Sequence, residues 1–328
     1  MVAINKIKGG SAFLSLLKDE GVTHIFGNPG TTELPLMDAL GRQSELPYIL
    51  GLQESVVIGM ADGFGRASGQ ITSCNVHVAP GLGNAMGAIY NAAFTGTPII
   101  ITAGQQEQGH GLTEPVLYAP LVPIASPLVK WAVEITRLED MPRIVRRAAK
   151  VAMTPPTGPV FISLPGDVLN DEAGLELGST TRIDTKVRPS DDAIDRLATR
   201  LIEAKNPLII AGNEVVTSDA LAETGQLATT LGGPAYQQTV AYNVQFPSEH
   251  PAYMGALSRE QALIRQTLDP HDVLLFVGAD VLRTSVASDV EPMPPNVTVI
   301  QIGLRDWEAG KNSPAEIALH ADVRETLR

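Results

Sequence analysis

Short apolar segments alternate with longer amphipathic segments along most of this chain, and the alternation predicts parallel strands joined by helices. Strands are expected at 23–27, 47–51, 71–79, 98–104, 158–165, 207–212, 272–280 and 297–303. Helices are expected at 11–20, 33–40, 54–68, 83–94, 191–204, 220–231 and 260–268. Strands that are apolar on both faces require helices above and below the sheet. The sequence therefore predicts an α/β protein with doubly wound, mainly parallel sheets.

The alternation is interrupted once, near the middle of the chain. From residue 166 to 190 it fades into GDVLNDEAGLELGSTTRIDTKVRPS, which has no periodic apolar face and is typical of an exposed linker. A chain of 328 residues is also long for a single core. We therefore expect two domains, at 1–170 and 191–328, with a linker at 171–190.

Composition and charge narrow the classes of function. The hydrophobic fraction of 44% and the charged fraction of 18% are ordinary for a folded α/β protein. A formal net charge of −12 opposes binding to nucleic acid or to an anionic membrane. The single cysteine, Cys74, excludes a disulfide within the chain and a cysteine-rich zinc site. The first residues form neither a signal peptide nor a membrane span, so a cytoplasmic location is expected.

The loop GNPGTTELP, at residues 27–35, directly follows a predicted strand. Gly27 and Gly30 permit unusual backbone angles and close approach of a ligand, and Pro29 stiffens the turn. Thr32 precedes a predicted helix and is interpreted as its N-cap. Taken alone, the segment is better explained as a tight strand-to-helix turn.

Two further segments place a titratable side chain at a strand end. Glu54 begins the helix that follows LQ, where the helix dipole favours a carboxylate without any catalytic role. His77 lies in HVAPGLGNAMGA, whose glycines fall one residue short of the dinucleotide fingerprint, so that signal is weak. His110 and His271 lack neighbours at metal-ligand spacing, and no metal site is predicted in this chain.

The joint occurrence and order of these segments are more specific than any one of them. GNPGTTELP, LQESVVIGMADGFGRASG, NVHVAPGLGNAMGAIYNA, PIIITAGQQ, PLVKWA and GPVFISLP closely resemble thiamin-diphosphate-dependent 2-oxo-acid decarboxylases of the benzoylformate decarboxylase type. The resemblance covers about residues 12–170 and continues more loosely through 250–255 and 272–280. It implies a pyrimidine-binding domain followed by a Rossmann-like central domain.

The resemblance also implies roles for particular residues. Glu54 matches the glutamate that hydrogen-bonds the aminopyrimidine ring of thiamin diphosphate and activates it. His77 matches an active-site histidine that moves protons near the substrate, and Thr31 matches a serine that contacts the substrate carboxylate. Pro29 and Gly30 match backbone that packs beside the cofactor. The implied reaction releases carbon dioxide and an aldehyde from a small 2-oxo acid.

The chain departs from the family pattern in two places. A second active-site histidine of the family is absent, and Ser285 stands near its position in VLRTSVASDV. No GDG motif with its following asparagine is present, so the ligands of Mg²⁺ and the diphosphate are expected in a C-terminal domain that this chain lacks. The alternatives are a truncated enzyme, a split enzyme with a separate diphosphate-binding chain, and a non-catalytic descendant. The family forms its site between subunits, so a homo-oligomer, a dimer or tetramer, is implied.

Three other functions remain open from the sequence. An acetolactate-synthase-like carboligase is the nearest, although such relatives carry a TSGPG-like sequence where this chain has HVAPG, and they can hold flavin in the central domain. A binding or regulatory module of the same fold would have no chemical need for both Glu54 and His77. A nicotinamide dehydrogenase rests on the weak glycine pattern alone.

Overall fold

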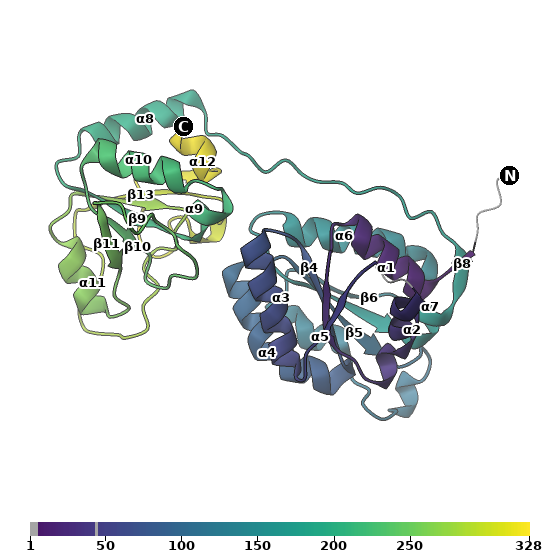
Figure 1. The fold of residues 1–328 in the computed structure, drawn as a ribbon. Coiled ribbons are helices and arrows are strands. Elements are labelled where there is room, and N and C mark those ends of the chain that lie inside the picture. The colour runs from purple at the N-terminus through teal and green to yellow at the C-terminus, as the bar shows by residue number, and fades with distance from the viewer. Residues whose placement is uncertain (1–5, 43–44) are drawn as a thin grey trace. The chain divides into compact units, whose positions relative to one another are not determined.

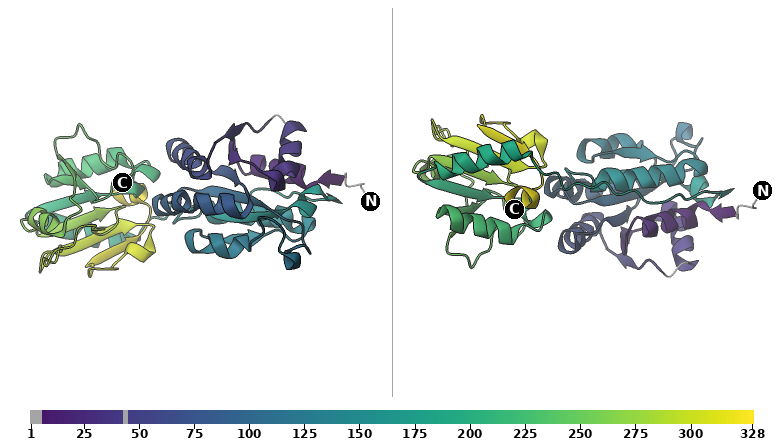
Figure 2. Two further views of the ribbon diagram at one scale, coloured as in Figure 1. Left: turned by 90° about the horizontal axis from the view of Figure 1, so that it is seen from below. Right: turned by 90° about the horizontal axis from the view of Figure 1, so that it is seen from above.

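The computed structural model describes residues 6–42 and 45–328. The chain divides into two compact units, Met1–Ile183 and Asp184–Arg328, which are described separately. Each unit contains a six-stranded parallel sheet. Helices cover both faces of each sheet, as Figures 1 and 2 show. The predicted fold class, α/β with doubly wound sheets, is confirmed. Among the described residues, no helix is long and apolar enough to cross a membrane.

In the first unit, the strand order is β3-β2-β4-β5-β7-β6, and all neighbouring strands are parallel. A separate antiparallel pair joins β1 to β8. The strands are β1 (Lys6–Lys8), β2 (Ile25–Asn28), β3 (Tyr48–Leu50), β4 (Thr72–Val76), β5 (Ile99–Gln105), β6 (Ala132–Glu134), β7 (Val160–Pro165) and β8 (Glu172–Gly174).

Two apolar cores lie on the two faces of this sheet. Alternate residues of β5 show the division, because Ile100 packs into one core while Ile99 and Ile101 pack into the other. The first core is covered by α1 (Gly9–Asp19), α2 (Leu34–Arg42), α6 (Met141–Met153) and α7 (Gly166–Asn170). The second is covered by α3 (Glu54–Ser68), α4 (Val78–Thr95) and α5 (Leu121–Ala125). Short 3₁₀ turns are η1 (Thr31–Glu33), η2 (Gly111–Thr113), η3 (Ser126–Leu128) and η4 (Leu138–Asp140).

The second unit repeats the plan with the strand order β11-β10-β9-β12-β13-β14, again parallel throughout. Its strands are β9 (Pro207–Ala211), β10 (Ala235–Gln237), β11 (Tyr253–Ala256), β12 (Val273–Val277), β13 (Thr298–Gly303) and β14 (Ile317–His320). One face is covered by α8 (Asp191–Ile202), α9 (Asn213–Thr217), α10 (Leu221–Leu231) and α12 (Val323–Leu327), and the other by α11 (Gln261–Leu268). The turn η5 (Asp306–Glu308) follows β13.

The strand predicted at 71–79 was too long, and the helix predicted at 83–94 began too late. Strand β4 ends at Val76, His77 is the N-cap of α4, and the helix starts at Val78. The buried residues Val78, Leu82 and Ala85 follow the spacing of a helix, and this stripe continues into the core. The glycines between them hid the stripe from the sequence pattern. The prediction also missed β1, β6, β8, β10, β11, β14, α5, α6, α7, α9 and α12, most of which are short.

Hydrogen bonds hold the segment predicted as a linker at 171–190 near both of its ends. It begins with β8, which pairs with β1, and Arg146 of α6 then donates hydrogen bonds to the carbonyls of Leu177 and Gly178. Arg182 donates to the backbone carbonyl of Glu20 at 2.6 Å. Within the second unit, the Asp322 amide donates to the carbonyl of Val187 at 2.9 Å. The extended segment visible in Figure 1 is therefore held except for the few residues between these anchors.

Candidate active site

The expected site residues lie at the carboxyl edge of the first sheet. After β2 the chain runs through α2 to β3 on one side, whereas after β4 it runs through α4 to β5 on the other side. The helices that follow β2 and β4 pack on opposite faces, so the two loops diverge between these strands. This is the topological switch point, where ligands bind to open α/β sheets.

Glu54 is the first residue of α3, and its side chain turns inward. The residue is only 6% exposed. Its Oε1 accepts a hydrogen bond from Asn28 Nδ2 at 3.0 Å, and its Oε2 accepts one from Asn84 Nδ2 at 3.1 Å. Asn28 ends β2 and Asn84 lies on α4, so the carboxyl lies where β2, α3 and α4 converge.

His77 lies between β4 and α4, at the N-cap position of the helix. Its Nδ1 is 2.8 Å from Glu33 Oε2 and 3.3 Å from the hydroxyl of Thr32. The histidine side chain is 21% exposed, whereas that of Glu33 is 1% exposed. The imidazole is thus held from one edge of the ring by a buried carboxyl while part of it faces outward.

Glu33 is a site residue that the sequence analysis missed. Besides His77, its carboxyl accepts hydrogen bonds from the Gly30 amide at 2.7 Å and the Gly104 amide at 2.8 Å. It therefore connects the loop after β2 to the ends of β4 and β5. The sequence offered one signal, since a glutamate three residues after a helix-capping position often bonds back to the capping amide.

The N-cap predicted at Thr32 is wrong. Gly30 is the N-cap residue of η1, and Glu33, not Thr32, bonds its amide. The Thr32 hydroxyl instead donates to Glu33 Oε1 at 2.8 Å. The turn η1 intervenes before α2, which begins at Leu34, so Thr32 lies inside a turn and its side chain is directed to the carboxyl.

Two glycines allow these groups to come together. A Cβ on Gly81 would lie 2.9 Å from Glu54 Oε1 and 3.0 Å from His77 Cβ, and a Cβ on Gly30 would lie 2.1 Å from His77 Nδ1. The structure thus brings Glu54 and His77 together at Gly81, and Gly30 against the ring of His77. Pro29 is partly exposed beside them, and Thr31 begins η1 with an exposed side chain.

This donor set fits the pyrimidine half of thiamin diphosphate. A buried carboxyl can bond a ring nitrogen. The absence of side chains at Gly30 and Gly81 lets His77 and Glu54 pack closely against the backbone there. The ligands of Mg²⁺ are not expected among these residues. Among the described residues, no group of three or more His, Cys, Asp or Glu side chains is arranged to hold a metal ion.

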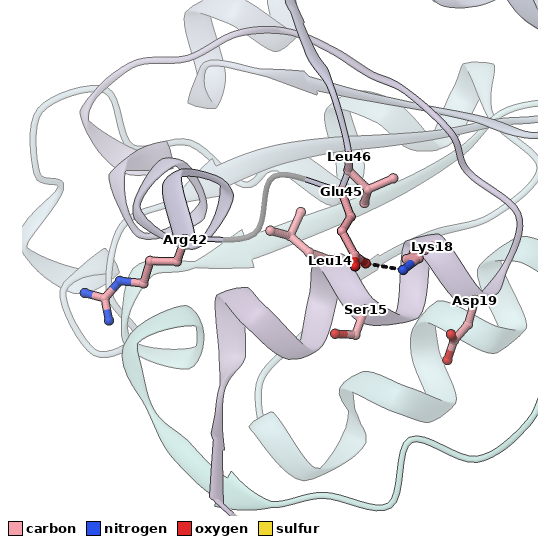
Figure 3. Close-up of a pocket in the computed structure, with 7 residues that line it drawn as sticks. All are labelled: Leu14, Ser15, Lys18, Asp19, Arg42, Glu45 and Leu46. Atoms are coloured by element: carbon pink, nitrogen blue, oxygen red, sulfur yellow. Dashed lines mark hydrogen bonds and ion pairs between the residues drawn. The ribbon is translucent and has the colours of Figure 1, made fainter.

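A pocket of about 450 Å³ lies elsewhere in the first unit (Figure 3). It is lined by Leu14, Ser15, Lys18, Asp19, Arg42, Glu45 and Leu46, and Lys18 pairs with Glu45 across it. These residues include the end of α1 before β2 and the segment just before β3, so the pocket lies toward the amino ends of the strands. It therefore contributes none of the side chains described above.

Two family models match the chain. Residues 7–115 match the N-terminal TPP binding domain of thiamine pyrophosphate enzymes, and residues 194–328 match the central domain of the same enzymes. Thiamine pyrophosphate and thiamin diphosphate are one compound. The first match spans β2, α3 and β4, and therefore includes Glu54 and His77.

Individual relatives agree with these models. The benzoylformate decarboxylase of Pseudomonas aeruginosa is 35% identical over 320 residues, which are 97% of this chain and 60% of the relative. An acetolactate synthase large subunit from Haemophilus influenzae is 25% identical, over 99% of this chain and 57% of the relative. The solved thiamine diphosphate-dependent 4-hydroxybenzoylformate decarboxylase of Rhodococcus jostii superposes with a TM-score of 0.91 at 33% identity, over 98% of this chain and 61% of that chain. The chain thus spans about 60% of the length of the relatives it matches.

Proposed function

The chain belongs to the thiamine pyrophosphate enzymes, and from that premise we propose that it serves in the decarboxylation of a small 2-oxo acid to an aldehyde. The observation that carries the proposal is the buried Glu54 carboxyl at the switch point of the first sheet, with His77 beside it around Gly81. In this proposal the first unit binds the pyrimidine half of the cofactor. The diphosphate and Mg²⁺ are assigned to other parts of the assembled enzyme, a homo-oligomer.

Glu54 is the residue we assign to the cofactor's ring. When bound, the cofactor supplies a nucleophilic carbon and an electron sink for the bond to the departing carboxyl group. A carboxyl that is buried and held at both oxygens can pass a proton to a ring nitrogen and recover it without reorganising. The turn at Pro29 and Gly30 is assigned to backbone that packs beside the cofactor, and Gly81 lets the Glu54 carboxyl lie close to α4.

His77 is the residue we assign to proton transfer at the substrate. Because Nδ1 is bonded to Glu33, the other ring nitrogen, Nε2, is the one left to face a reacting group. The buried carboxyl orients the ring in the way that a supporting acid orients a catalytic histidine. The exposed Thr31 hydroxyl, on the same loop, is assigned to the carboxylate of the substrate.

A carboligase of the acetolactate synthase type is the second candidate, because a relative of that name covers 99% of this chain. The 35% identity to the benzoylformate decarboxylase of Pseudomonas aeruginosa is higher than the 25% identity to this synthase, and this favours the decarboxylase.

The test is a turnover assay on the enzyme that contains this chain, purified with thiamin diphosphate and Mg²⁺. We expect carbon dioxide and aldehyde to form in equal amounts from an aryl or branched 2-oxo acid, and no turnover after removal of the cofactor. Formation of a 2-hydroxy ketone or acetohydroxy acid as the main product would establish the carboligase instead. Absence of any cofactor-dependent reaction across a panel of 2-oxo acids would refute both.

A further inference from the structure

In the first turn of α3, two backbone amides donate to the side chain of Gln53 rather than to that of Glu54. A glutamate at the start of a helix is attracted to the unpaired backbone N–H groups there. In this chain the Gln53 side chain caps the helix, since its Oε1 accepts the Ser55 amide at 2.7 Å and the Val56 amide at 3.2 Å. The Glu54 carboxyl is therefore free of its own helix and turns toward other elements.

Two asparagines take up the carboxyl that the helix leaves free. Asn28 reaches Oε1 from the end of β2, and Asn84 reaches Oε2 from the second turn of α4. An amide nitrogen only donates, so both oxygens of Glu54 act as acceptors in this arrangement. Asn28 precedes Glu54 in the sequence and Asn84 follows it, and their two contacts together fix the plane of the carboxyl.

Asn84 is itself braced by the residue next to Glu54. The Ser55 hydroxyl donates to the Asn84 carbonyl at 2.6 Å. Two adjacent hydrogen bonds thus join the beginnings of α3 and α4, one to the backbone carbonyl of Asn84 and one from its side-chain amide. Gly81, one turn earlier on α4, lets the helix approach Glu54 closely.

We propose that Asn28 and Asn84 are positioning residues that fix the two oxygens of Glu54 for its contact with the cofactor. The proposal rests on the role of Glu54 proposed above and extends it to two side chains. Asn84 is exposed at the surface of the unit, so solvent can replace part of its contact. A hydrogen bond to a charged group in such a setting changes a rate by about tenfold, and that is the effect expected of each amide.

The experiment compares Asn28→Ala, Asn84→Ala and Asn84→Asp with the wild-type enzyme in its cofactor-loaded form. We expect each alanine variant to lower kcat by about tenfold, with KM for the 2-oxo acid within about twofold. Asn84→Asp keeps the size of the side chain but replaces the donor with a like charge, so its loss should be at least as large. The near-ultraviolet circular dichroism of the bound aminopyrimidine ring should weaken in all three variants.

Asn91→Ala is the matched control, because Asn91 is exposed on the same helix two turns beyond Asn84. It should leave kcat, the dichroism signal and the melting temperature at their wild-type values. The proposal is overturned if both alanine variants keep kcat within about twofold of wild type. It is also overturned if their activity falls only in step with a fall in melting temperature, which would show a merely structural role.

A second measurement on this chain alone separates the two proposals. The side-chain amide signals of Asn28 and Asn84 in a ¹H–¹⁵N spectrum should shift in Glu54→Gln, while that of Asn91 stays in place. If wild-type enzyme shows no cofactor-dependent turnover but these signals shift, the proposed function fails and the contact to Glu54 stands. Unchanged signals overturn the positioning proposal whatever the enzyme catalyses.

Discussion

At the carboxyl edge of the first sheet, Glu54 and Glu33 are buried acids, and at the same edge of the second sheet, Glu214 and Asp280 are buried acids. Glu54 accepts hydrogen bonds from two side-chain amides, and Glu33 supports a partly exposed histidine. In the second unit, Asp280 is paired with Arg283 at 2.9 Å and Arg305 at 3.1 Å, and Glu214 accepts the Leu304 amide.

The difference lies in what neutralises each acid. In the second unit, cations and backbone amides of the same unit satisfy the carboxyls, so the switch point is closed by the protein's own groups. In the first unit, neutral amides and glycines surround Glu54, which leaves the carboxyl available to a ligand. The two units share one architecture. Buried acids serve the structure of the second unit and, in our proposal, the chemistry of the first.

The largest effect that would test this comparison is the loss of Glu54. Glu54→Gln keeps the shape of the side chain and removes its ability to transfer a proton, so turnover should fall by about 10²–10⁴-fold. The fold should remain intact, as measured by circular dichroism and melting temperature. Glu214→Gln is the matched control in the second unit and should leave turnover within about twofold of wild type. Near-normal activity in Glu54→Gln would refute the assignment of Glu54.

The next effect concerns Glu33, which we expect to act through His77. Glu33→Gln removes the charge that orients the imidazole and should lower kcat by about 10- to 100-fold in the wild-type background. The same change in a His77→Ala background should cost little more, because the group that Glu33 orients is already gone. Equal losses in the two backgrounds, measured as a double-mutant cycle, would show that Glu33 acts on the fold rather than on His77.

The substitution with the smallest expected effect on turnover, Glu214→Gln, tests instead a pH dependence of the stability of the second unit. Burial raises the pKa of Glu214 from its ordinary value of 4.5 to about 7, although the Leu304 amide and Arg305 oppose this shift. At pH values between about 4.5 and 7, the folded state keeps a proton on Glu214 that the unfolded state has released. The free energy of unfolding should therefore decrease as the pH rises from about 4.5 to 7, by about 3 kcal/mol.

Urea denaturation of wild type and Glu214→Gln at a series of pH values measures this term. The decrease should be smaller by that amount in the glutamine variant, which has no proton to lose. Identical pH profiles for the two proteins would show that Glu214 does not retain its proton in the folded state.

Much of the fold followed from local pattern. The helix expected at 54–68 is α3 with the same bounds, and the strands expected at 98–104 and 207–212 differ from β5 and β9 by one residue at each end or less. These segments are long or strongly apolar, and their period is unambiguous. The short edge strands β6, β11 and β14 were not predicted, because three or four residues carry too little periodicity to distinguish a strand from a loop.

The candidate site was only partly visible from the sequence. Glu54, His77, Pro29, Gly30 and Thr31 were named through the resemblance of their motifs, and their catalytic and binding roles stay predictions. Glu33 was passed over because its neighbours in sequence suggest an ordinary helix start. Its contacts to Gly104 and His77 join residues 71 and 44 positions apart, and no local pattern reports such pairs.

The sequence by itself determined the class of fold, the family and the residue types brought to the strand ends, because hydrophobic period and motif order are properties of the chain. The tertiary structure alone decided which of those residues meet. Asn28, Glu54 and Asn84 belong to three different elements, and they touch only because β2 pairs with β4 while α3 packs on α4. Sheet pairing and helix packing set distances between residues far apart in the chain, and those distances determine what each carboxyl can do.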